Sequence, residues 1–503
     1  MDIKRIAVIG AGPSGLVALN EFLHTSKNGS STINSYNSLE NKKLPTNCAF
    51  DEIILFEQGS DIGGTWRYSE ACDPPFPYDI EEYNKPYQFR QSMKISKNMW
   101  DKSGIYNHLF SNVPEGSMKF SSAQDIELSD TNVEMNPYYP FIKHEQVLEY
   151  LEKFCDVNEL KKHIRFNSSV EKIYKDESTS KWTIHVLDKD GGIKIEVFDA
   201  VMVSTGRFNI PFIPKISNLK SFKGDNSSNA LIHTKSFRNA KDFSGKKVLL
   251  VGSSISAIDI LQYLIPACKE VYLSTNKSTV EPPNPVTDDK LVPGKWMNDI
   301  LNDSNIGYVK CARIKAIIND GKSVEFEDGL IVDDFDNIIF ATGYHLSFPF
   351  LDIPENDGKN YINIVSGKKD NNNYAHLKFN NIYMHTFSMT DATLAFSGIA
   401  HNTLLFLTSE ANAVAASGVW SNKHTIPELT VQQQWCDLQN DNMKDGLKVI
   451  QDEQLVEFFD ELYEFAPDNR VKITPLLNTE YVERSRLVLK KIFYDIANKV
   501  MEY

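Results

Sequence analysis

The chain of 503 residues has few cysteines, no long apolar run and no excess of positive charge. A membrane-spanning helix needs about 20 consecutive apolar residues, and no run approaches that length. We therefore expect no membrane span. A predicted strand begins close to the N-terminus, so we expect no signal peptide either. The formal net charge of −14 argues against nucleic acid or an anionic membrane surface as a partner.

The cysteines are widely spaced and include no Cys-x-x-Cys pair, which is typical of reduced thiols in a cytosolic protein. They also lack the ligand spacing of a metal site, and we predict none. The six positions are Cys48, Cys72, Cys155, Cys268, Cys311 and Cys436.

What the chain does contain is two glycine-rich turns, each directly after a short apolar run. The first reads Gly-Ala-Gly-Pro-Ser-Gly and follows residues 5–9, whose apolar pattern predicts a buried parallel strand. A turn of small residues between such a strand and a helix lets the helix N-terminus face a pyrophosphate. We therefore assign nucleotide contacts in this turn to Gly10, Gly12, Pro13, Ser14 and Gly15.

The second turn, residues 252–257, follows another apolar run at 247–251. It is a degenerate copy, because Ser254 and Ala257 replace two of the glycines. Hydroxyl side chains at such a turn can bond phosphate directly, so Ser254 and Ser256 are candidate ligands. Alone this match would be weak, but both turns have the required strand before them and a helical pattern after them. The pair predicts a protein that holds two dinucleotides.

The end of the next strand indicates which dinucleotide each turn binds. In the first unit the run over residues 51–57 predicts a second strand that ends in Glu57, whose carboxylate can accept a ribose 2′-hydroxyl, with Gln58 beside it. The distance from Gly15 to Glu57 is longer than usual because residues 25–48 are rich in Ser and Asn, which suggests a solvated surface insertion. In the second unit no carboxylate follows residues 269–273, and Lys277 could attract a 2′-phosphate. The first site therefore fits FAD and the second NADPH.

The missing cysteine pair also narrows the class of enzyme. Flavin disulfide reductases carry two nucleotide folds but pass electrons through two cysteines beside the flavin. This chain has no such pair, so electrons from a flavin would need another acceptor, and molecular oxygen is the obvious one.

Several further motifs resemble the flavin-containing monooxygenases, a family of class B flavoprotein monooxygenases. Gly63-Gly64-Thr65-Trp66 follows Glu57 as in that family, and the segments at 204–206 and 341–344 resemble its two crossovers between nucleotide domains. Residues 391–398 are similar to the fungal members. The resemblance spans almost the whole chain.

A signature of the family, Phe-x-Gly-x-x-x-His-x-x-x-Phe/Tyr, is matched by Phe222, Gly224, His233 and Phe237. Eight residues separate Gly224 from His233 where the signature has three. A short surface insertion costs little closure entropy, so the departure affects the loop rather than the class. Baeyer–Villiger monooxygenases usually carry Trp where this chain has Phe237, which favours heteroatom oxidation. We expect packing or hydrogen-bonding roles for these residues rather than catalytic ones.

The resemblance also implies site residues that the pattern alone does not identify. Asn112 matches the asparagine that faces flavin and nicotinamide in the family, and an amide can both donate and accept there. Asp259, on the helix after the second turn, could orient the NADPH pyrophosphate, although the helix dipole alone also favours an acid in a first turn. The remaining residues placed at the cofactors are Ser111, Val113, Thr65, Trp66 and Gly343.

The predicted fold class is α/β, with two Rossmann-like domains packed as three layers of sheet and helix. Residues 1–212 and 341–503 would form the FAD domain, and residues 213–340 an inserted NADPH domain. Within the first domain we expect an amphipathic helix over 145–154, with Val147, Leu148, Leu151 and Phe154 on one face. A second is expected over 481–503, with Leu487, Leu489, Ile492 and Ile496. Polar loops are expected at 225–229 and 367–373.

The resemblance implies an NADPH- and O2-dependent monooxygenase that oxygenates soft sulfur or nitrogen nucleophiles through a C4a-hydroperoxyflavin. In the fungal branch the substrates are thiols such as glutathione, cysteine and cysteamine, whose sulfenic products condense to disulfides. Two alternatives stay open: a Baeyer–Villiger or N-hydroxylating enzyme, and a catalytically weak FAD/NADP-binding protein. Because the chain lacks the apolar C-terminal anchor of mammalian relatives, we expect a cytoplasmic enzyme, at most peripheral to the endoplasmic reticulum. The oligomeric state is open, with a homodimer as one option.

Overall fold

The computed structural model describes most of the chain in twelve stretches. They comprise residues 2–74, 102–129, 136–225, 230–275, 295–346, 348–352, 364–366, 376–379, 381–400, 402–441, 450 and 452–499. The expected loops at 226–229 and 367–373, and Lys277, lie outside these residues.

The first of two main sheets has seven strands in the order β20-β21-β22-β7-β1-β2-β3. Its centre is parallel: β1 (Arg5–Ile9) lies between β2 (Glu52–Phe56) and β7 (Ala200–Val203). The remaining strands are β3 (Ile164–Arg165), β20 (Ile382–Tyr383), β21 (Phe387–Ser388) and β22 (Leu394–Phe396). Strands covered on both faces need apolar side chains throughout, which is why 6–9 and 53–56 are continuously buried.

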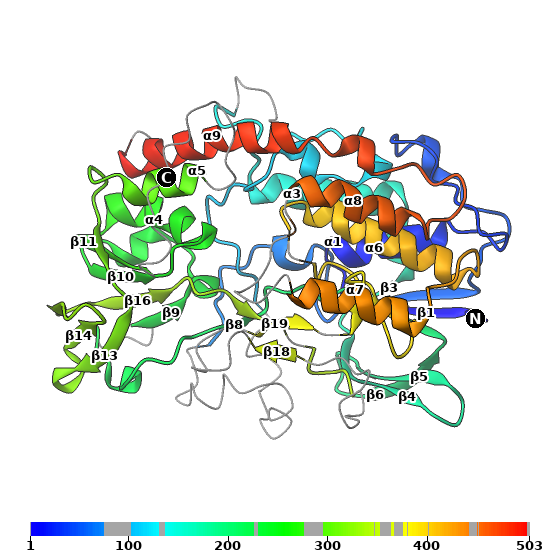
Figure 1. The fold of residues 1–503 in the computed structure, drawn as a ribbon, viewed down its shortest axis with the longest axis horizontal. Coiled ribbons are helices and arrows are strands. Elements are labelled where there is room, and N and C mark those ends of the chain that lie inside the picture. The colour runs from blue at the N-terminus through cyan, green and yellow to red at the C-terminus, as the bar shows by residue number, and fades with distance from the viewer. Residues whose placement is uncertain are drawn as a thin grey trace.

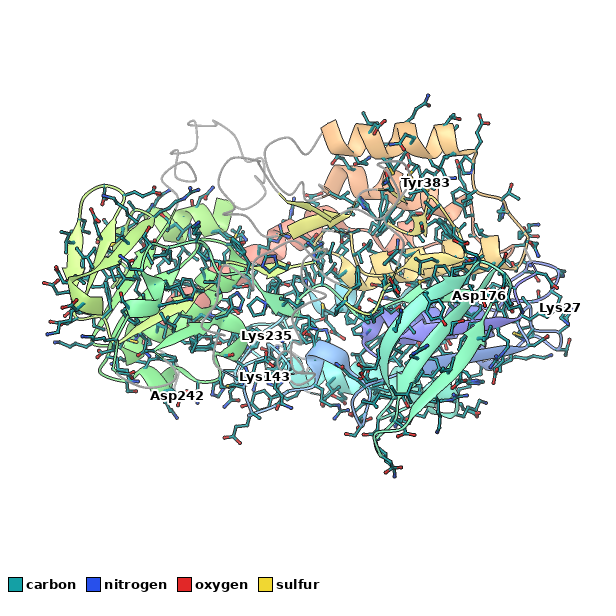
Figure 2. The ribbon with its side chains drawn as sticks, turned by 90° about the horizontal axis from the view of Figure 1, so that it is seen from below. Lys27, Lys143, Asp176, Lys235, Asp242 and Tyr383 are labelled. Atoms are coloured by element: carbon teal, nitrogen blue, oxygen red, sulfur yellow. The ribbon has the colours of Figure 1, made fainter. Side chains whose placement is uncertain are left out.

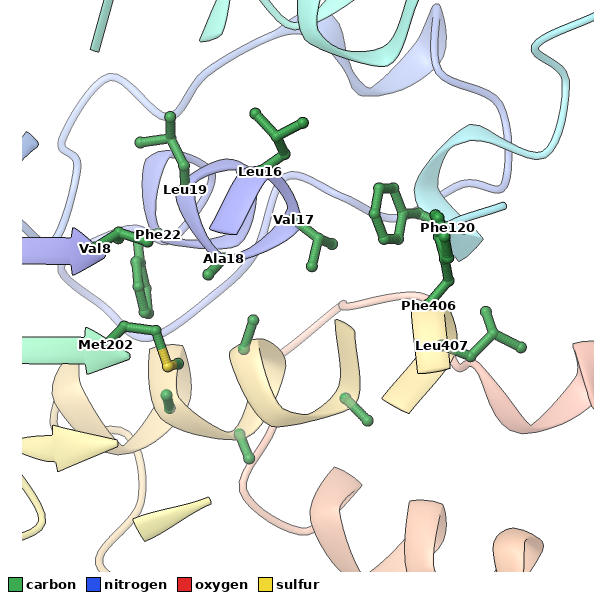
Figure 3. Close-up of a cluster of buried hydrophobic side chains, with 14 of the residues drawn as sticks. Val8, Leu16, Val17, Ala18, Leu19, Phe22, Phe120, Met202, Phe406 and Leu407 are labelled. Carbon is green, nitrogen blue, oxygen red and sulfur yellow. The ribbon is translucent and has the colours of Figure 1, made fainter. Parts of the chain in front are cut away.

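Helices cover one face of this sheet, and a second sheet covers the other. α1 (Pro13–Leu23) packs against α6 (Leu405–Trp420), with Phe22 stacked on Trp420 at 5.1 Å between ring centroids. Figure 3 shows the aliphatic face of α1 lying on α6. The opposite face carries β4 (Ser169–Asp176), β5 (Lys181–Leu187) and β6 (Ile193–Phe198). The predicted three-layer α/β arrangement is confirmed, with a sheet rather than helices as the third layer.

The second main sheet has five parallel strands in the order β12-β11-β10-β16-β9. They are β9 (Leu231–His233), β10 (Lys247–Val251), β11 (Glu270–Ser274), β12 (Val309–Cys311) and β16 (Asn337–Phe340). α4 (Ile255–Ala267) and α5 (Lys295–Asn302) accompany it. A small antiparallel sheet contributes to the core with it, made of β13 (Ile314–Ile318), β14 (Ser323–Phe326) and β15 (Ile331–Asp333). We call the seven-stranded sheet with its helices and β4–β6 the first unit, and the five-stranded sheet with its helices and β13–β15 the second unit. Both units combine a parallel sheet, helices and a small antiparallel sheet.

The two units are joined at a short two-stranded sheet. β8 (Ile210–Pro211) pairs antiparallel with β17 (Tyr344–His345), so the outgoing and returning chains lie side by side. All strands of the five-stranded sheet fall between residues 231 and 340, and those of the seven-stranded sheet lie outside that range. Figure 1 shows the second unit in green beside the first. A separate hairpin pairs β18 (Ile364–Ser366) with β19 (His376–Phe379).

The C-terminal helix α9 (Thr479–Ala497) packs on the second unit although the chain reaches it from the first. Ile492 and Ile496 are buried in one apolar cluster with residues of α4 and α5, and Lys490 pairs with Asp299 of α5 at 2.8 Å. Figure 1 shows α9 running across both units. Leu487, expected on the buried face, is 61% exposed, because it lies on the outer side of α9, opposite the buried Val482 and Ile492.

The other predicted amphipathic helix is α3 (His144–Val157), longer than expected by a few residues. Val147, Leu151 and Phe154 are buried as expected, while Leu148 is half-buried. Two further helices, α7 (Leu429–Asp441) and α8 (Asp452–Tyr463), complete the first unit.

The Ser/Asn-rich segment 25–48 is not simply a solvated insertion, which corrects the expectation from composition. Ser31 and Asn41 are buried, and Asn41 donates to the carbonyls of Ser35 and Ser122. The segment also joins the chain after α8, where Ser31 N donates to Asp468 O at 2.8 Å. Its polar side chains serve buried backbone groups that no regular element pairs.

A buried ion cluster ties α1 to α6. Arg470 donates to both oxygens of Glu21 on α1, at 2.9 and 2.8 Å, and to Glu410 on α6 at 2.7 Å. All three side chains are at most 1% exposed. Burial raises the pKa of Glu21, and Arg470 opposes that effect. Two carboxylates around one guanidinium stabilise the layer only while the cation is present.

Within the described residues, no helix is both long and apolar enough to cross a membrane. The same residues contain no group of three or more His, Cys, Asp or Glu side chains placed to hold a metal ion. All six cysteines lie in this part of the chain, and none forms a disulfide.

Candidate active site

The first glycine turn is closely packed at each of its glycines. A Cβ on Gly15 would lie 1.8 Å from the carbonyl oxygen of Gly10. Gly10 itself has φ +99°, and a Cβ there would lie 2.9 Å from Ser204 O. Gly12 meets the backbone of Gly64, since a Cβ on Gly64 would lie 2.8 Å from Gly12 Cα. Gly10 and Gly15 are therefore required for steric reasons, and α1 begins directly at this turn, with Pro13 in its first turn.

Glu57 lies directly after β2, and its carboxylate braces this turn. One oxygen accepts from Ala11 N at 2.7 Å and the other from Gly59 N at 2.7 Å. Burial raises the pKa of Glu57, while these two N–H donors lower it. Each oxygen keeps a lone pair for a further donor, so the predicted ribose contact is compatible with both bonds. Gln58, next in the chain, is exposed.

The Gly-Gly-Thr-Trp segment folds over the same turn. Gly63 N donates to Ala11 O at 2.9 Å, and Gly63 adopts φ +115° before a single 3-10 turn, Gly64–Trp66. Thr65 is exposed, and Trp66 is half-buried against the core of the first unit. The hydroxyl of Ser14 contacts that of Ser409 on α6 at 2.8 Å. These contacts enclose the start of α1 from two sides.

The second turn is more open. Gly252 has φ +125°, and a Cβ there would lie 2.4 Å from Ala341 O, so this glycine is required. Ser254 caps α4 without a side-chain bond to the helix, and both Ser254 and Ser256 are exposed. Ala257, which replaces the last glycine, is fully buried. The two hydroxyls are thus available to a phosphate beside a helix N-terminus.

The two turns contact the two crossover segments in the same way. Gly10 lies against Ser204, and Gly252 lies against Ala341. Gly343 has φ +83°, and its carbonyl accepts from Phe212 N at 2.8 Å in the paired crossover strands. Each dinucleotide turn is therefore fixed to the place where the chain changes units.

The segment 103–113 carries the predicted catalytic residue and touches both units. Ser103 donates to Thr65 O in the first unit, and His108 O accepts from Tyr263 Oη of α4 at 2.7 Å. Ser111 is buried and donates to Val113 O at 2.8 Å. Val113 is buried, while Asn112 between them is exposed. The backbone thus presents the Asn112 amide outward from a fixed pair of neighbours.

Asp259 does not lie in the first turn of α4, which corrects one basis for its assignment. It lies in the second turn, where its carboxylate accepts from Tyr106 Oη of segment 103–113 and from Gln262 Nε2 at 2.9 Å. Burial raises the pKa of Asp259 to about 6. No signal in the sequence indicated Tyr106, because the contact joins residues 153 positions apart.

The family signature forms a packed junction between the units. Phe237 is buried and stacks on Phe243 at 5.8 Å between ring centroids. His233 accepts from Lys235 N through Nδ1, and burial lowers its pKa to about 3. Gly224 lies against Asp336 O. These positions pack and orient, as their sequence suggested.

Two cations in the same stretch were missed by sequence reasoning. Lys235 is 2% exposed and pairs with the buried carboxylate of Asp73 at 2.8 Å; Figure 2 shows it between the two units. Arg238 donates to the carbonyls of Ser69, Ala71 and Ser103. Charged residues in a loop are usually exposed to solvent, so nothing in the sequence indicated that Lys235 and Arg238 are buried and bonded between segments.

Two parallel sheets, one with a glycine turn at the carboxyl end of β1 and the other with such a turn at the carboxyl end of β10, are typical of an oxidoreductase that binds two dinucleotides. Structures similar to this chain include S-allyl-L-cysteine S-oxygenase from Allium sativum, with TM-score 0.67, 23% identity and coverage of 100% and 95% of the two chains. Tmm from Pelagibacter sp. strain HTCC7211 has TM-score 0.65 and 22% sequence identity, and the match covers 99% of this chain and 92% of that chain. These likenesses establish the fold.

The family itself follows from the sequence. Residues 89–280 and 286–369 match the flavin-binding monooxygenase-like family model, and the chain belongs to that family. Similar curated proteins include flavin-containing monooxygenase iboF of Amanita muscaria, 26% identical over 85% of this chain and 81% of that protein. Flavin-containing monooxygenase FMO GS-OX-like 8 of Arabidopsis thaliana is 28% identical over 84% of this chain and 76% of that protein.

The protein is thus an NADPH-dependent flavin monooxygenase whose cofactors are FAD and NADPH. The residues present fit both groups. In the first turn a Cβ at Gly10, Gly15 or Gly64 would collide with neighbouring backbone, so only glycine keeps the tight turn that faces a pyrophosphate, and the second turn offers exposed hydroxyls at a helix start.

Proposed function

We propose that this enzyme oxygenates soft sulfur and nitrogen nucleophiles, with a preference for small biological thiols. The observation that carries the proposal is the path of segment 103–113, which contacts the turn at Thr65, then α4 of the second unit, and then presents Asn112. A single segment thereby relates an amide side chain to both nucleotide sites. Positioning of this kind is the main task of a protein around a flavin.

In this proposal residues 1–212 and 341–503 hold FAD and residues 213–340 hold NADPH. The FAD contacts are Gly10, Gly12, Pro13, Ser14, Gly15, Glu57, Gln58, Thr65, Trp66, Ser111 and Val113. The NADPH contacts are Ser254, Ser256, Lys277 and Gly343, while Asp259 lies on the helix of this site without touching the nucleotide. The exposed hydroxyls of the second turn and the braced carboxylate of the first support this division.

The reduced flavin supplies the activation of O2, and the chain supplies position and shelter from water. Asn112 can donate to a reacting oxygen through Nδ2 and accept from the nicotinamide amide through Oδ1. It has no proton to lose near neutral pH, so it stabilises without acting as a base. A sulfur or nitrogen nucleophile attacks an electrophilic oxygen with its own lone pair and needs no protein base.

The names of similar proteins support sulfur and nitrogen as the acceptors. They include an S-allyl-L-cysteine S-oxygenase and a trimethylamine monooxygenase of Methylocella silvestris, 28% identical over 69% of this chain. The likeness of residues 391–398 to fungal members favours thiols such as glutathione, cysteine and cysteamine. The six free cysteines support a cytoplasmic location, at most peripheral to the endoplasmic reticulum.

Oxygen balance with defined acceptors tests the proposal. The FAD-loaded enzyme is given NADPH with cysteamine, glutathione, trimethylamine or cyclohexanone, and consumed NADPH is compared with product and H2O2. We expect disulfide from the thiols in proportion to NADPH, with a higher kcat/KM than for the amine. An ester from the ketone would indicate Baeyer–Villiger chemistry, and H2O2 equal to NADPH with every acceptor would contradict oxygenation.

The variant N112A tests the role of the amide. We expect it to retain FAD and to oxidise NADPH, while most reducing equivalents leave as H2O2. The matched control is Asn305→Ala, which changes an exposed asparagine bonded only to Asp303 in a turn after α5. Unchanged coupling in N112A would remove Asn112 from the site.

A further inference from the structure

The contact between Asp259 and Tyr106 joins the two units at the segment that carries Asn112. Tyr106 is 4% exposed and donates to one carboxylate oxygen of Asp259. Gln262, one turn further along α4, donates to the other oxygen at 2.9 Å. Both oxygens of Asp259 are thereby occupied by groups of the protein.

A second tyrosine of α4 holds the same segment. Tyr263 is 3% exposed, and its hydroxyl donates to His108 O at 2.7 Å. The rings of Tyr106 and Tyr263 meet edge to face at 5.8 Å, and Phe237 meets Tyr106 at 5.4 Å. Residues 106–108 are therefore docked on α4 by two hydroxyl bonds and a cluster of aromatic rings.

The same segment is fixed to the first unit a few residues later. Leu109 O accepts from His144 N at 3.1 Å, and Ser111 N donates to Ile142 O at 2.7 Å. Between the docked residues 106–108 and Asn112 there are only three residues, 109–111. A shift of Tyr106 relative to α4 therefore changes the position of the Asn112 amide, and a small misplacement is costly for an oriented reaction.

We propose that Asp259 is a positioning residue: through Tyr106 it docks segment 103–113 on α4 and so fixes the spacing between the Asn112 amide and the second nucleotide turn. The proposal rests on the proposed function for the importance of that spacing. The docking of segment 103–113 on α4 can be tested without any measurement of catalysis. The carboxylate acts as a hydrogen-bond acceptor, so its negative charge is not required.

Hydrogen exchange of the FAD-loaded protein without NADPH tests the docking. The variants are Y106F, which removes the donor, D259L, which removes the acceptor, and D259N, which keeps an acceptor oxygen after the Gln262 amide turns. The control is Y272F, which removes a hydroxyl bonded only to Glu270 on β11. In Y106F and D259L we expect amides of residues 104–113 to exchange about tenfold faster, the equivalent of one hydrogen bond. D259N and Y272F should match the native protein.

Steady-state kinetics of the same proteins provide the second measurement. We expect Y106F and D259L to release a larger fraction of electrons as H2O2, without a matching rise in KM for NADPH. If D259L does not fold, Y106F carries both measurements. Unchanged exchange in Y106F, or D259N exchanging as fast as D259L, would overturn the proposal. A selective rise in KM for NADPH would overturn it too, because Asp259 would then act on the nucleotide.

The two proposals fail in different ways. If the native enzyme oxygenates no acceptor, the proposed function fails while the exchange experiment still decides the docking. If the native enzyme oxygenates thiols but exchange in Y106F is unchanged, only the positioning role of Asp259 fails.

Discussion

The two glycine turns perform the same task with different degrees of closure. In the first, Gly15 and Gly64 leave no room for a Cβ, and the 63–66 turn and Ser409 enclose the start of α1. In the second, only Gly252 is sterically required, Ala257 takes the place of the last glycine, and both serine hydroxyls are exposed. Each first glycine contacts a crossover segment, so the difference lies in what covers the turn.

The difference suggests how the two nucleotides behave. A turn enclosed by another backbone segment binds its ligand with little exchange, because release requires movement of that segment. An open turn with exposed hydroxyls permits binding and release in each cycle. We expect FAD to stay bound through many turnovers and the nicotinamide nucleotide to exchange at the second turn.

The largest expected effect is from Gly15→Ala in the first turn. Its Cβ would lie 1.8 Å from Gly10 O, so α1 must move away from β1 and the pyrophosphate cradle is lost. We expect purified G15A to contain little or no FAD, measured from flavin absorbance per protein. The matched change in the second turn, A257G, costs about 1 kcal/mol of helix stability and should retain FAD. Full FAD content in G15A would show that the first turn is not closed.

Removing the cation of the buried cluster should destabilise the first unit. Arg470→Met leaves the carboxylates of Glu21 and Glu410 buried without a cation, which costs about 3–5 kcal/mol. Because burial raises the folded-state pKa of Glu21, ionisation opposes folding, and the loss should grow between pH 5 and pH 8. Urea unfolding at both pH values measures it. The control R484M removes an exposed pair and should change stability by less than about 1 kcal/mol; equal effects of the two variants would contradict the account.

A smaller effect is expected from Glu57→Gln. Glutamine keeps one acceptor oxygen, so either Ala11 N or Gly59 N would face an amide NH2 group. One unsatisfied donor costs about 1–3 kcal/mol, which predicts roughly tenfold or more weaker FAD binding in apoprotein titrations. Glu52→Gln, at the exposed start of the same strand, is the control. Equal FAD affinity in E57Q and E52Q would show that the brace is unimportant.

The smallest effect belongs to the open turn. Replacing Ser254 and Ser256 together by alanine removes two exposed hydroxyls, each a bond of about 1 kcal/mol when made. We expect KM for NADPH to rise several-fold while FAD content stays complete. The control Ser178→Ala changes a hydroxyl in an exposed turn of the first unit, bonded to Asp176. If the double variant loses FAD instead, the assignment of the two turns is wrong.

Patterns local in the sequence predicted most of the fold. Short apolar runs before the turns became β1 and β10, and the apolar spacing at 145–154 became α3. These succeed because strand burial and helix periodicity depend on neighbouring residues. The prediction for Leu487 failed because this residue lies on the outer side of α9, away from the buried Val482 and Ile492, and tertiary packing decides which side of a helix is covered. Segment 25–48 failed because composition does not reveal which polar groups serve buried backbone.

Some residues of the candidate site could be predicted from local patterns in the sequence, and others could not. The glycines and the two serines could be assigned from the sequence because the turn motif fixes their spacing, and Glu57 could be assigned because it follows the next apolar strand. Tyr106, Lys235 and Arg238 were not, since each acts across the junction of the units through contacts with distant parts of the chain. Burial of a charged side chain such as Lys235 is set by tertiary packing, and no local pattern indicates it.

The most direct test of the account is the fate of molecular oxygen in a single turnover series. The FAD-loaded enzyme is supplied with NADPH, labelled 18O2 and a thioether, whose sulfoxide retains the transferred atom. The account predicts one labelled oxygen per sulfoxide and one NADPH consumed per product. Unlabelled product, or H2O2 equal to the NADPH consumed with no sulfoxide, would contradict it.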